Sequence, residues 1–353
     1  MQTTLSDTNH NGSMPHKITD ANGLPLGAAG RAAPLVSSPA PHDGKLRDAM
    51  RRIETNLTGV IRGKASSIEL ILLALASGGH VLLEDAPGTG KTTLAKAIAA
   101  SMDGLFRRVQ FTPDLLPADI TGSSFYNPAD GSFEFRPGPV FANVLLADEI
   151  NRTSPRTQSA LLEVMGENQV TTDGRRHALP EPYFVVATQN PSDYGGTYPL
   201  PEAQLDRFML RVTLGYPDPE SELAILFAQN NHHPLDDLTP VTSTAEIQAI
   251  QQEVKAIRLD QSIAEYVIRI VGGTRNDGRL RLGLSPRGSL ALFRTAQARA
   301  WWHGRDFVLP EDVRVLAEPV LAHRLVLDTK AKYAGARPED VIAELIESVP
   351  VPR

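Results

Sequence analysis

Apolar residues between positions 44 and 218 recur as short runs that alternate with longer stretches of helical character. Short apolar runs bounded by turn residues are typical of buried strands. Thr92–Ser101 has the pattern of a helix. The alternation indicates an α/β fold, with a mostly parallel sheet and helices on both faces, and ligands of such sheets bind at the carboxyl ends of the strands. The runs predicted to be strands are Val81–Leu83, Phe106–Phe111, Val144–Ala147, Phe184–Ala187 and Phe208–Leu214.

After Pro219 the pattern changes, and helical spacing replaces the short apolar runs. Expected helices such as Pro286–His303 and Pro310–Leu325 carry proline in their first turn, where its missing N–H costs nothing. We therefore predict a second, all-helical domain at residues 219–353, after an α/β core at residues 44–218. The expected helices are Glu220–Asn230, Thr244–Ile257, Gln261–Val271, Pro286–His303, Pro310–Leu325 and Pro338–Glu347.

The first 43 residues have a different composition from the rest of the chain. They are rich in Pro, Gly, Ala, Ser and Asn, and the first aromatic residue of the whole chain is Phe106. Such a stretch cannot bury enough apolar surface to offset the entropy lost on ordering. The sequence predicts a disordered tail, and a tether to another protein is the alternative.

Composition and charge narrow the functional class. The chain has 353 residues, no cysteine and a formal net charge of −6. The absence of cysteine rules out disulfides and thiolate metal sites, and it suits a reducing cytosol. The negative charge argues against nucleic acid as a partner. The most apolar early run, Ile68–Ala76, is shorter than the about 20 residues of a membrane span. We expect a cytoplasmic protein without a membrane span.

The stretch "LLEDAPGTGKTTLAKAIAA", residues 82–100, follows a predicted strand and opens a predicted helix. It resembles a phosphate-binding loop, in which glycine-rich backbone turns N–H groups toward phosphate. Lys91 is expected to reach the β- and γ-phosphates of ATP, and the Thr92 hydroxyl to ligate Mg²⁺. Asp85 stands where the pattern has its first glycine. The predicted nucleotide-binding residues are Asp85, Ala86, Pro87, Gly88, Thr89, Gly90, Lys91, Thr92 and Thr93.

A pair of acidic residues ends the predicted strand in "VLLADEIN". Asp148 and Glu149 lie at the edge of the sheet where the phosphate-binding loop also begins. Asp148 is expected to hold Mg²⁺ through water, and Glu149 to polarise the attacking water. A solvated acidic pair is the alternative, and the neighbouring loop argues against it.

Six stretches match a single family pattern: "GGHVLLEDAPGTGKT", "QFTPDLLPADITG", "LLADEINR", "ATQNP", "EAQLDRF" and "GLSPR". They lie within residues 45–350 and resemble the MoxR family of AAA+ ATPases. Members of that family often have a residue other than glycine at the position of Asp85, so the resemblance implies an intact nucleotide site.

The resemblance assigns roles to residues outside the loop. Asn190 resembles the first sensor, whose amide orients the attacking water. Arg207 resembles the arginine finger that a neighbouring subunit inserts, and Arg287 the second sensor, acting in its own subunit or across the interface. Arg152 resembles a further interface arginine. From the residues alone, Asn190 also suits an Asn-Pro turn, and Arg207 a surface ion pair with Asp206.

The same resemblance implies an assembly and a task. An arginine supplied by a neighbour makes oligomerisation a requirement of catalysis, and the resemblance implies a ring, for which a hexamer is expected. MoxR proteins act as chaperones that mature a client or insert its cofactor or metal, commonly with a partner carrying a von Willebrand factor A domain. Two other functions remain open: a DNA-remodelling motor and the ATPase subunit of a magnesium chelatase.

Two further segments resemble inserts of the MoxR and magnesium-chelatase branch. Residues 123–141 and 170–180 each have extended stretches around an Asp-Gly turn, which predicts hairpins. In the first, Phe133 and Phe135 alternate with polar residues. We predict that its aromatic face grips a client or partner, and covering a sheet edge is the alternative.

Overall fold

The computed structural model describes residues 44–190, 197–228 and 233–352. The predicted tail at residues 1–43 lies outside this part of the chain. Within it, no helix combines the length and the apolar character that a membrane crossing requires.

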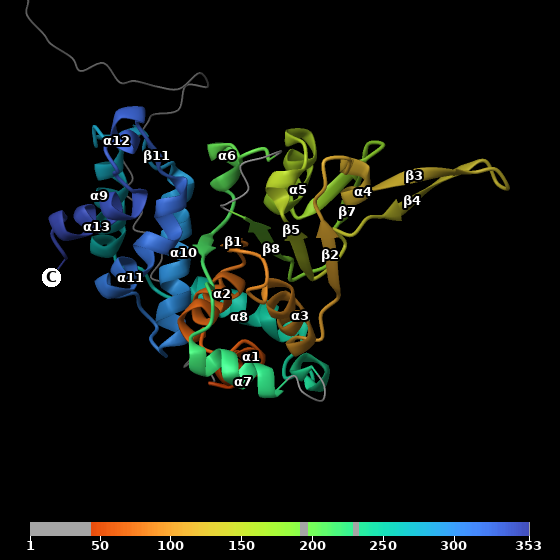
Figure 1. Ribbon diagram of the computed structural model, residues 1–353, viewed down its shortest axis with the longest axis horizontal. Helices are drawn as coiled ribbons and strands as arrows, with labels where there is room; N and C mark the ends of the chain where they lie inside the picture. The colour runs from red at the N-terminus through yellow and green to blue at the C-terminus, as the bar shows by residue number, and fades with distance from the viewer. Residues whose placement is uncertain (1–43, 191–196, 229–232, 353) are drawn as a thin grey trace, which may run out of the picture. The chain divides into compact units, whose positions relative to one another are not determined.

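A five-stranded sheet forms the centre of the α/β region, with the strand order β2-β5-β8-β1-β9 (Figure 1). Every neighbouring pair in this sheet is parallel. All five predicted strands are present, which confirms the predicted fold class. Their bounds are β1 Val81–Glu84, β2 Phe106–Gln110, β5 Val144–Asp148, β8 Phe184–Gln189 and β9 Leu210–Val212.

The central strands β1, β5 and β8 are buried on both faces of the sheet. Successive side chains of a strand point to opposite faces, so neighbouring residues enter different clusters. In β1, Leu83 belongs to one hydrophobic cluster, with residues of α2 and α3, whereas Leu82 belongs to a second, with residues of α5. The two clusters explain why the central strands β1, β5 and β8 are apolar along most of their length, whereas the edge strands β2 and β9 also carry polar side chains. The helices of this region are α1 Lys45–Val60, α2 Ala65–Ala76, α3 Lys91–Ser101, α4 Pro117–Thr121, α5 Pro155–Glu167 and α6 Glu202–Leu205.

Two antiparallel hairpins occupy the predicted inserts. The first consists of β3 Gly122–Asn127 and β4 Ser132–Pro137, and the second of β6 Gln169–Thr172 and β7 Arg175–Ala178. The tight turns contain residues in the left-handed region, among them a glycine in each hairpin. In Figure 1 the first hairpin extends away from the sheet.

The described residues after β9 are mainly helical, as predicted, and they also contain one short strand pair. Strands of two and three residues are too short to show a periodic signal in the sequence. β10 Leu280–Leu282 pairs with β11 Val326–Leu327. The helices are α7 Pro219–Ala228, α8 Thr244–Ala256, α9 Gln261–Arg275, α10 Pro286–Trp302, α11 Pro310–Leu321, α12 Thr329–Tyr333 and α13 Pro338–Ser348.

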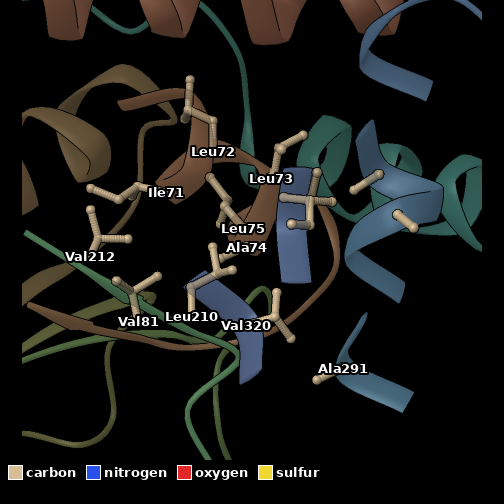
Figure 2. Close-up of a cluster of buried hydrophobic side chains, with 14 of the residues drawn as sticks. Ile71, Leu72, Leu73, Ala74, Leu75, Val81, Leu210, Val212, Ala291 and Val320 are labelled. Carbon is tan, nitrogen blue, oxygen red and sulfur yellow. The ribbon is translucent and has the colours of Figure 1, made fainter. Parts of the chain in front are cut away.

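Helices from both regions share one hydrophobic core. α10 contacts α2, and α11 contacts β9. Figure 2 shows Val320 of α11 and Ala291 of α10 in the cluster that holds Leu210 and the apolar face of α2. The helical region therefore packs directly on the edge strand β9, next to the segment that carries Arg207.

Candidate functional site

The loop between β1 and α3 turns at two glycines. Gly88 and Gly90 have φ angles of +86° and +90°, in the left-handed region that glycine adopts without steric cost. A Cβ at Gly88 would meet no atom within 4 Å, so backbone conformation, rather than space, favours glycine there. Gly90 is the N-cap of α3, and Lys91 is its first residue. The unpaired N–H groups of the first helical turn therefore face the loop, as in a phosphate site.

Lys91 folds back over this loop. Its Nζ donates hydrogen bonds to the backbone oxygens of Asp85, at 2.9 Å, and Ala86, at 2.8 Å. The ammonium group is thereby held at the mouth of the loop, where an incoming phosphate would replace the two carbonyls as its partner.

Asp85 explains the departure from the glycine pattern. Its side chain is buried, with 4% exposed, and its two oxygens accept hydrogen bonds from the backbone N–H groups of Leu214, at 2.6 Å, and Gly215, at 2.8 Å. The carboxylate points away from the phosphate-binding turn and ties it to the chain that follows β9. An aspartate at this position is therefore compatible with an anion site.

The acidic pair lies where β5 ends. Asp148 Oδ1 accepts a hydrogen bond of 2.7 Å from the Thr188 hydroxyl, and Oδ2 accepts one of 2.7 Å from Arg108. Glu149 has a left-handed backbone, with φ +57°, which costs a residue with a side chain about 1–3 kcal/mol. Its backbone N–H donates to the Thr188 hydroxyl at 2.9 Å. One threonine thus fixes the orientation of both acids.

Two neighbours engage the Glu149 carboxylate. Gln110 Nε2 donates to Glu149 Oε2 at 2.8 Å, and Arg152 Nε lies 3.3 Å from the same oxygen. The resemblance assigned Arg152 to a subunit interface, but here it contacts Glu149 of its own chain.

Arg108, Gln110 and Thr188 did not emerge from the sequence as site residues. The strand register explains their presence, because β2 pairs with β5 so that Gln110 lies beside Asp148. The only signal for Arg108 and Gln110 in the sequence is the alternation of polar side chains in "FRRVQF", and that pattern does not reveal which strand is the neighbour. Thr188 lies in "ATQNP", near the end of another predicted strand.

These residues surround a cavity of about 420 Å³. Its walls bring together Lys91, Thr92, Asp148, Glu149 and Asn190, as the sequence predicted. A second cavity of about 210 Å³ adjoins it across Gly88 and Gly90 and is partly apolar, with Val60, Ile61, Pro217 and Ile225 in its lining.

The donor set suits Mg²⁺. This ion commonly takes one or two protein oxygens and completes its shell with water and substrate phosphates. Asp148 offers one carboxylate and Thr92 one hydroxyl on the same cavity. In the described residues there is no cluster of three or more His, Cys, Asp or Glu side chains that would hold a metal ion without substrate.

Arg207 and Arg287 lie elsewhere. Both line a separate cavity of about 280 Å³, whose other lining residues include Asp206, Arg294 and Arg324 and none of those around Lys91. Arg207 Nη1 donates to the backbone oxygen of Leu162. Asp206 pairs with Arg324 rather than with Arg207, so the alternative of an Arg207–Asp206 surface ion pair was wrong. The structure brings the two arginines to each other but not to the phosphate-binding loop.

Two family profiles match this chain. Residues 80–210 match the ATPase family associated with various cellular activities (AAA), and residues 272–345 match the AAA lid domain.

Several full-length relatives are known. Uncharacterized protein YeaC of Bacillus subtilis is 50% identical over 84% of this chain and 93% of its own length. Chaperone MoxR1 of Mycobacterium tuberculosis is 38% identical over 95% and 94% of the two chains. Protein MoxR of Methylorubrum extorquens is 31% identical over 87% and 96%. A crystal structure from Cytophaga hutchinsonii, described as that of a candidate ATPase, has a TM-score of 0.81 at 37% identity, over 88% of this chain and 96% of that one.

Proposed function

Because the chain belongs to the MoxR family of AAA+ ATPases, we propose that it uses Mg²⁺-dependent ATP hydrolysis to mature, assemble or load a client protein. The observation that carries the proposal is the single cavity shared by Lys91, Thr92, Asp148, Glu149 and Asn190. A cation, two acids and an amide around one helix N-terminus are the parts that phosphoryl transfer to water requires.

Binding begins at the loop. The N–H groups of the first turn of α3 donate hydrogen bonds to the phosphate oxygens. Lys91 exchanges the backbone carbonyls of Asp85 and Ala86 for phosphate oxygens. The base of the nucleotide fits the adjoining, partly apolar cavity beside Val60 and Ile61. Thr92 and Asp148 would hold Mg²⁺, which supplies charge neutralisation on the β- and γ-phosphates when bound.

Glu149 is proposed as the base that polarises the attacking water, and Asn190 as the group that orients that water. Gln110 and Arg152 hold the Glu149 carboxylate in place, which limits the positions it can take. Thr188 fixes the backbone N–H of the same residue. We expect the general base to raise the rate of hydrolysis by a factor of about 10²–10⁴.

The arginine pair completes the site from another copy. Arg207 and Arg287 line a cavity without Lys91, Asp148 or Glu149, so these arginines suit the γ-phosphate of a neighbouring subunit. A ring of such subunits, with six expected, supplies every nucleotide site with one pair.

Two substitutions test the nucleotide site. Lys91→Ala is expected to abolish ATP binding, because the phosphates lose the mobile cation of the loop. Glu149→Gln should keep ATP affinity and lower kcat about 100-fold or more. Lys96→Ala and Glu163→Gln, both at exposed positions, are the matched controls. ATP binding by Lys91→Ala, or normal turnover by Glu149→Gln, would contradict the assignment.

The client role needs a separate experiment. Glu149→Gln loaded with ATP is expected to retain a protein with a von Willebrand factor A domain that Lys91→Ala with ATP does not retain. Salt-dependent retention of DNA instead would support a DNA-remodelling motor. Retention of a porphyrin-loading protein would support a magnesium-chelatase subunit.

A further inference from the structure

The segment that carries Arg207 is held by side chains of the helical region. Arg324 Nη1 donates to the backbone oxygen of Asp206 at 2.7 Å and also to the Asp206 carboxylate, while its Nη2 donates to the backbone oxygen of Phe208. His323 Nε2 lies 3.2 Å from the same Phe208 oxygen. The residues on both sides of Arg207 are therefore fixed by the 3₁₀ turn after α11.

Arg324 is buried, with 3% of its side chain exposed. Its Nε donates to the backbone oxygen of Val320 at 2.9 Å, so all three guanidinium nitrogens have partners. A buried charge is tolerated only when it is paired and hydrogen-bonded, and Asp206 provides the opposite charge. Because Arg324 takes up the charge of Asp206, that carboxylate does not neutralise the adjacent Arg207.

The second oxygen of Asp206 reaches the helix that carries Arg287. Ser285 Oγ donates to Asp206 Oδ2 at 2.8 Å and accepts the backbone N–H of Arg287 at 3.1 Å. Ser285 is the N-cap of α10. A single carboxylate thus links the backbone beside Arg207 to the first turn of the helix that presents Arg287.

We infer that Arg324 is a positioning residue: with Asp206 and Ser285 it sets the spacing between Arg207 and Arg287, so that both reach one phosphate group of a neighbouring copy. This inference rests on the proposed function, in which the two arginines act on the ATP of another subunit. Arg324 itself does not touch that phosphate. It acts through the backbone on either side of Arg207.

The inference predicts a loss of turnover without a loss of nucleotide affinity. Arg324→Lys keeps one positive charge, but a single ammonium nitrogen cannot reproduce the hydrogen bonds of the guanidinium group to Asp206, Phe208 and Val320. Because a misplacement of about 1 Å can cost 10²-fold in rate, kcat of the full-length assembled protein is expected to fall about 10- to 100-fold. The Kd of a fluorescent ATP analogue should change less than about twofold, since the residues around Lys91 are untouched.

Ser285→Ala is the second variant, for use whether or not Arg324→Lys folds. It removes the hydrogen bond to Asp206 and also the side-chain cap of α10. Ser243→Ala is its matched control, because Ser243 caps α8 through the N–H of Glu246 and does not contact the Arg207 segment. We expect Ser285→Ala to lower kcat at least fivefold and Ser243→Ala to leave it unchanged.

Mixing experiments separate positioning from general damage. Arg324→Lys subunits have an intact phosphate-binding loop, and Lys91→Ala subunits have a correctly held Arg207. Co-assembled rings should therefore show more ATPase activity than either variant shows alone. Failure of co-assembled rings to regain activity would overturn the inference, because the defect would then lie in the subunit's own nucleotide site.

Arg207→Ala distinguishes failure of the inference from failure of the proposed function. If Arg207→Ala lowers kcat while Arg324→Lys and Ser285→Ala do not, the positioning role is wrong and the proposed function stands. If Arg207→Ala turns over ATP normally, the proposed role of Arg207 is wrong, and the inference falls with it.

Discussion

Asp85 shows at the scale of one residue how a phosphate-binding loop can be anchored from outside. Its carboxylate satisfies two backbone N–H groups of the segment after β9, and one of them, that of Leu214, belongs to a buried residue. A buried donor left without an acceptor costs about 1–3 kcal/mol. The residue therefore contributes to stability, and its contribution to phosphate binding is indirect.

Replacing Asp85 tests whether this residue contributes to stability rather than directly to phosphate binding. Asp85→Ala is expected to lower the free energy of unfolding by about 1–3 kcal/mol, because Leu214 and Gly215 lose their acceptor. Asp85→Asn keeps one acceptor oxygen, so its free energy of unfolding should fall by less than that of Asp85→Ala. Urea unfolding measures both, and ATP affinity of the folded variants should stay close to that of the unmodified chain. Equal stability of all three proteins would show that the two hydrogen bonds contribute nothing.

A second residue, His80, makes stability depend on pH. Its Nδ1 accepts the backbone N–H of Val185 at 3.1 Å, so Nε2 carries the proton toward the Met165 oxygen at 3.2 Å. Burial lowers the pKa of His80 from 6.5 to about 4. The hydrogen bond to the Met165 oxygen raises the pKa of His80, but the effect of burial is larger. The folded state therefore keeps this imidazole neutral.

Acidification should consequently destabilise the protein through His80. Between pH 6.5 and 4 the unfolded chain binds a proton that the folded chain does not, so stability is fully present above pH 6.5 and is lost as the pH falls. The loss amounts to roughly 3 kcal/mol at 1.36 kcal/mol per pKa unit. Unfolding free energies at pH 7 and pH 4.5 should differ less in His80→Gln than in the parent chain. An identical difference would assign the pH dependence to other groups.

At the scale of elements, the first hairpin places Phe133 and Phe135 in different surroundings, although both follow the same alternating pattern in the sequence. Phe135 stacks on His177 with ring centroids 3.9 Å apart and lies 5.6 Å from the ring of Phe141. Phe133, one step nearer the tip on the same face, is 68% exposed and has the exposed ring of Tyr126 as its aromatic neighbour. The alternating pattern indicates the aromatic face but not how far the second hairpin and its surroundings cover it.

Because of this difference in burial, we expect different effects on stability from substitutions at Phe133 and Phe135. Phe135→Ala should lower stability by more than 1 kcal/mol, though by less than the about 3–5 kcal/mol of a fully buried phenylalanine. Phe133→Ala should stay within about 0.5 kcal/mol, as exposed substitutions do, and should spare basal ATPase activity. Melting curves and ATPase assays on both variants check this. A large loss of stability in Phe133→Ala would exclude its ring as a free contact surface for a client or partner.

Local elements could be predicted from the sequence, whereas contacts between distant elements could not. The strands and the phosphate-binding loop could be predicted because their signals are local: an apolar run, two glycines and a lysine within residues 81–91. Arg108 and Thr188 could not, since they reach Asp148 through the pairing of strands that are distant in sequence. The same holds for Arg324, whose contacts with the Arg207 segment cross more than a hundred residues of chain. Register and packing, rather than residue patterns, assemble those contacts.

At the scale of the whole molecule, one chain carries two separate cavities lined by predicted site residues. The cavity with Lys91 and Glu149 and the cavity with Arg207 and Arg287 have no lining residue in common. Each cavity is preorganised, the first by Thr188 and Gln110 and the second by the Arg324 contacts. Under the proposed function, the arginines of one subunit act on the ATP of another, so a complete site would form only when subunits associate.

Arg207→Ala tests that arrangement directly. The variant is expected to bind ATP with unchanged affinity, because the residues around Lys91 are intact, and to lose turnover. Arginine fingers contribute about 10³–10⁵ to rate in related NTPases, so even a partial role is measurable. When Arg207→Ala subunits are mixed with Lys91→Ala subunits, some interfaces combine an intact loop with an intact arginine, and activity should return in proportion to those interfaces. A chain carrying both substitutions, mixed with Arg207→Ala, is the matched control and should recover nothing. Co-assembly without recovery in the first mixture would place the action of Arg207 within its own subunit.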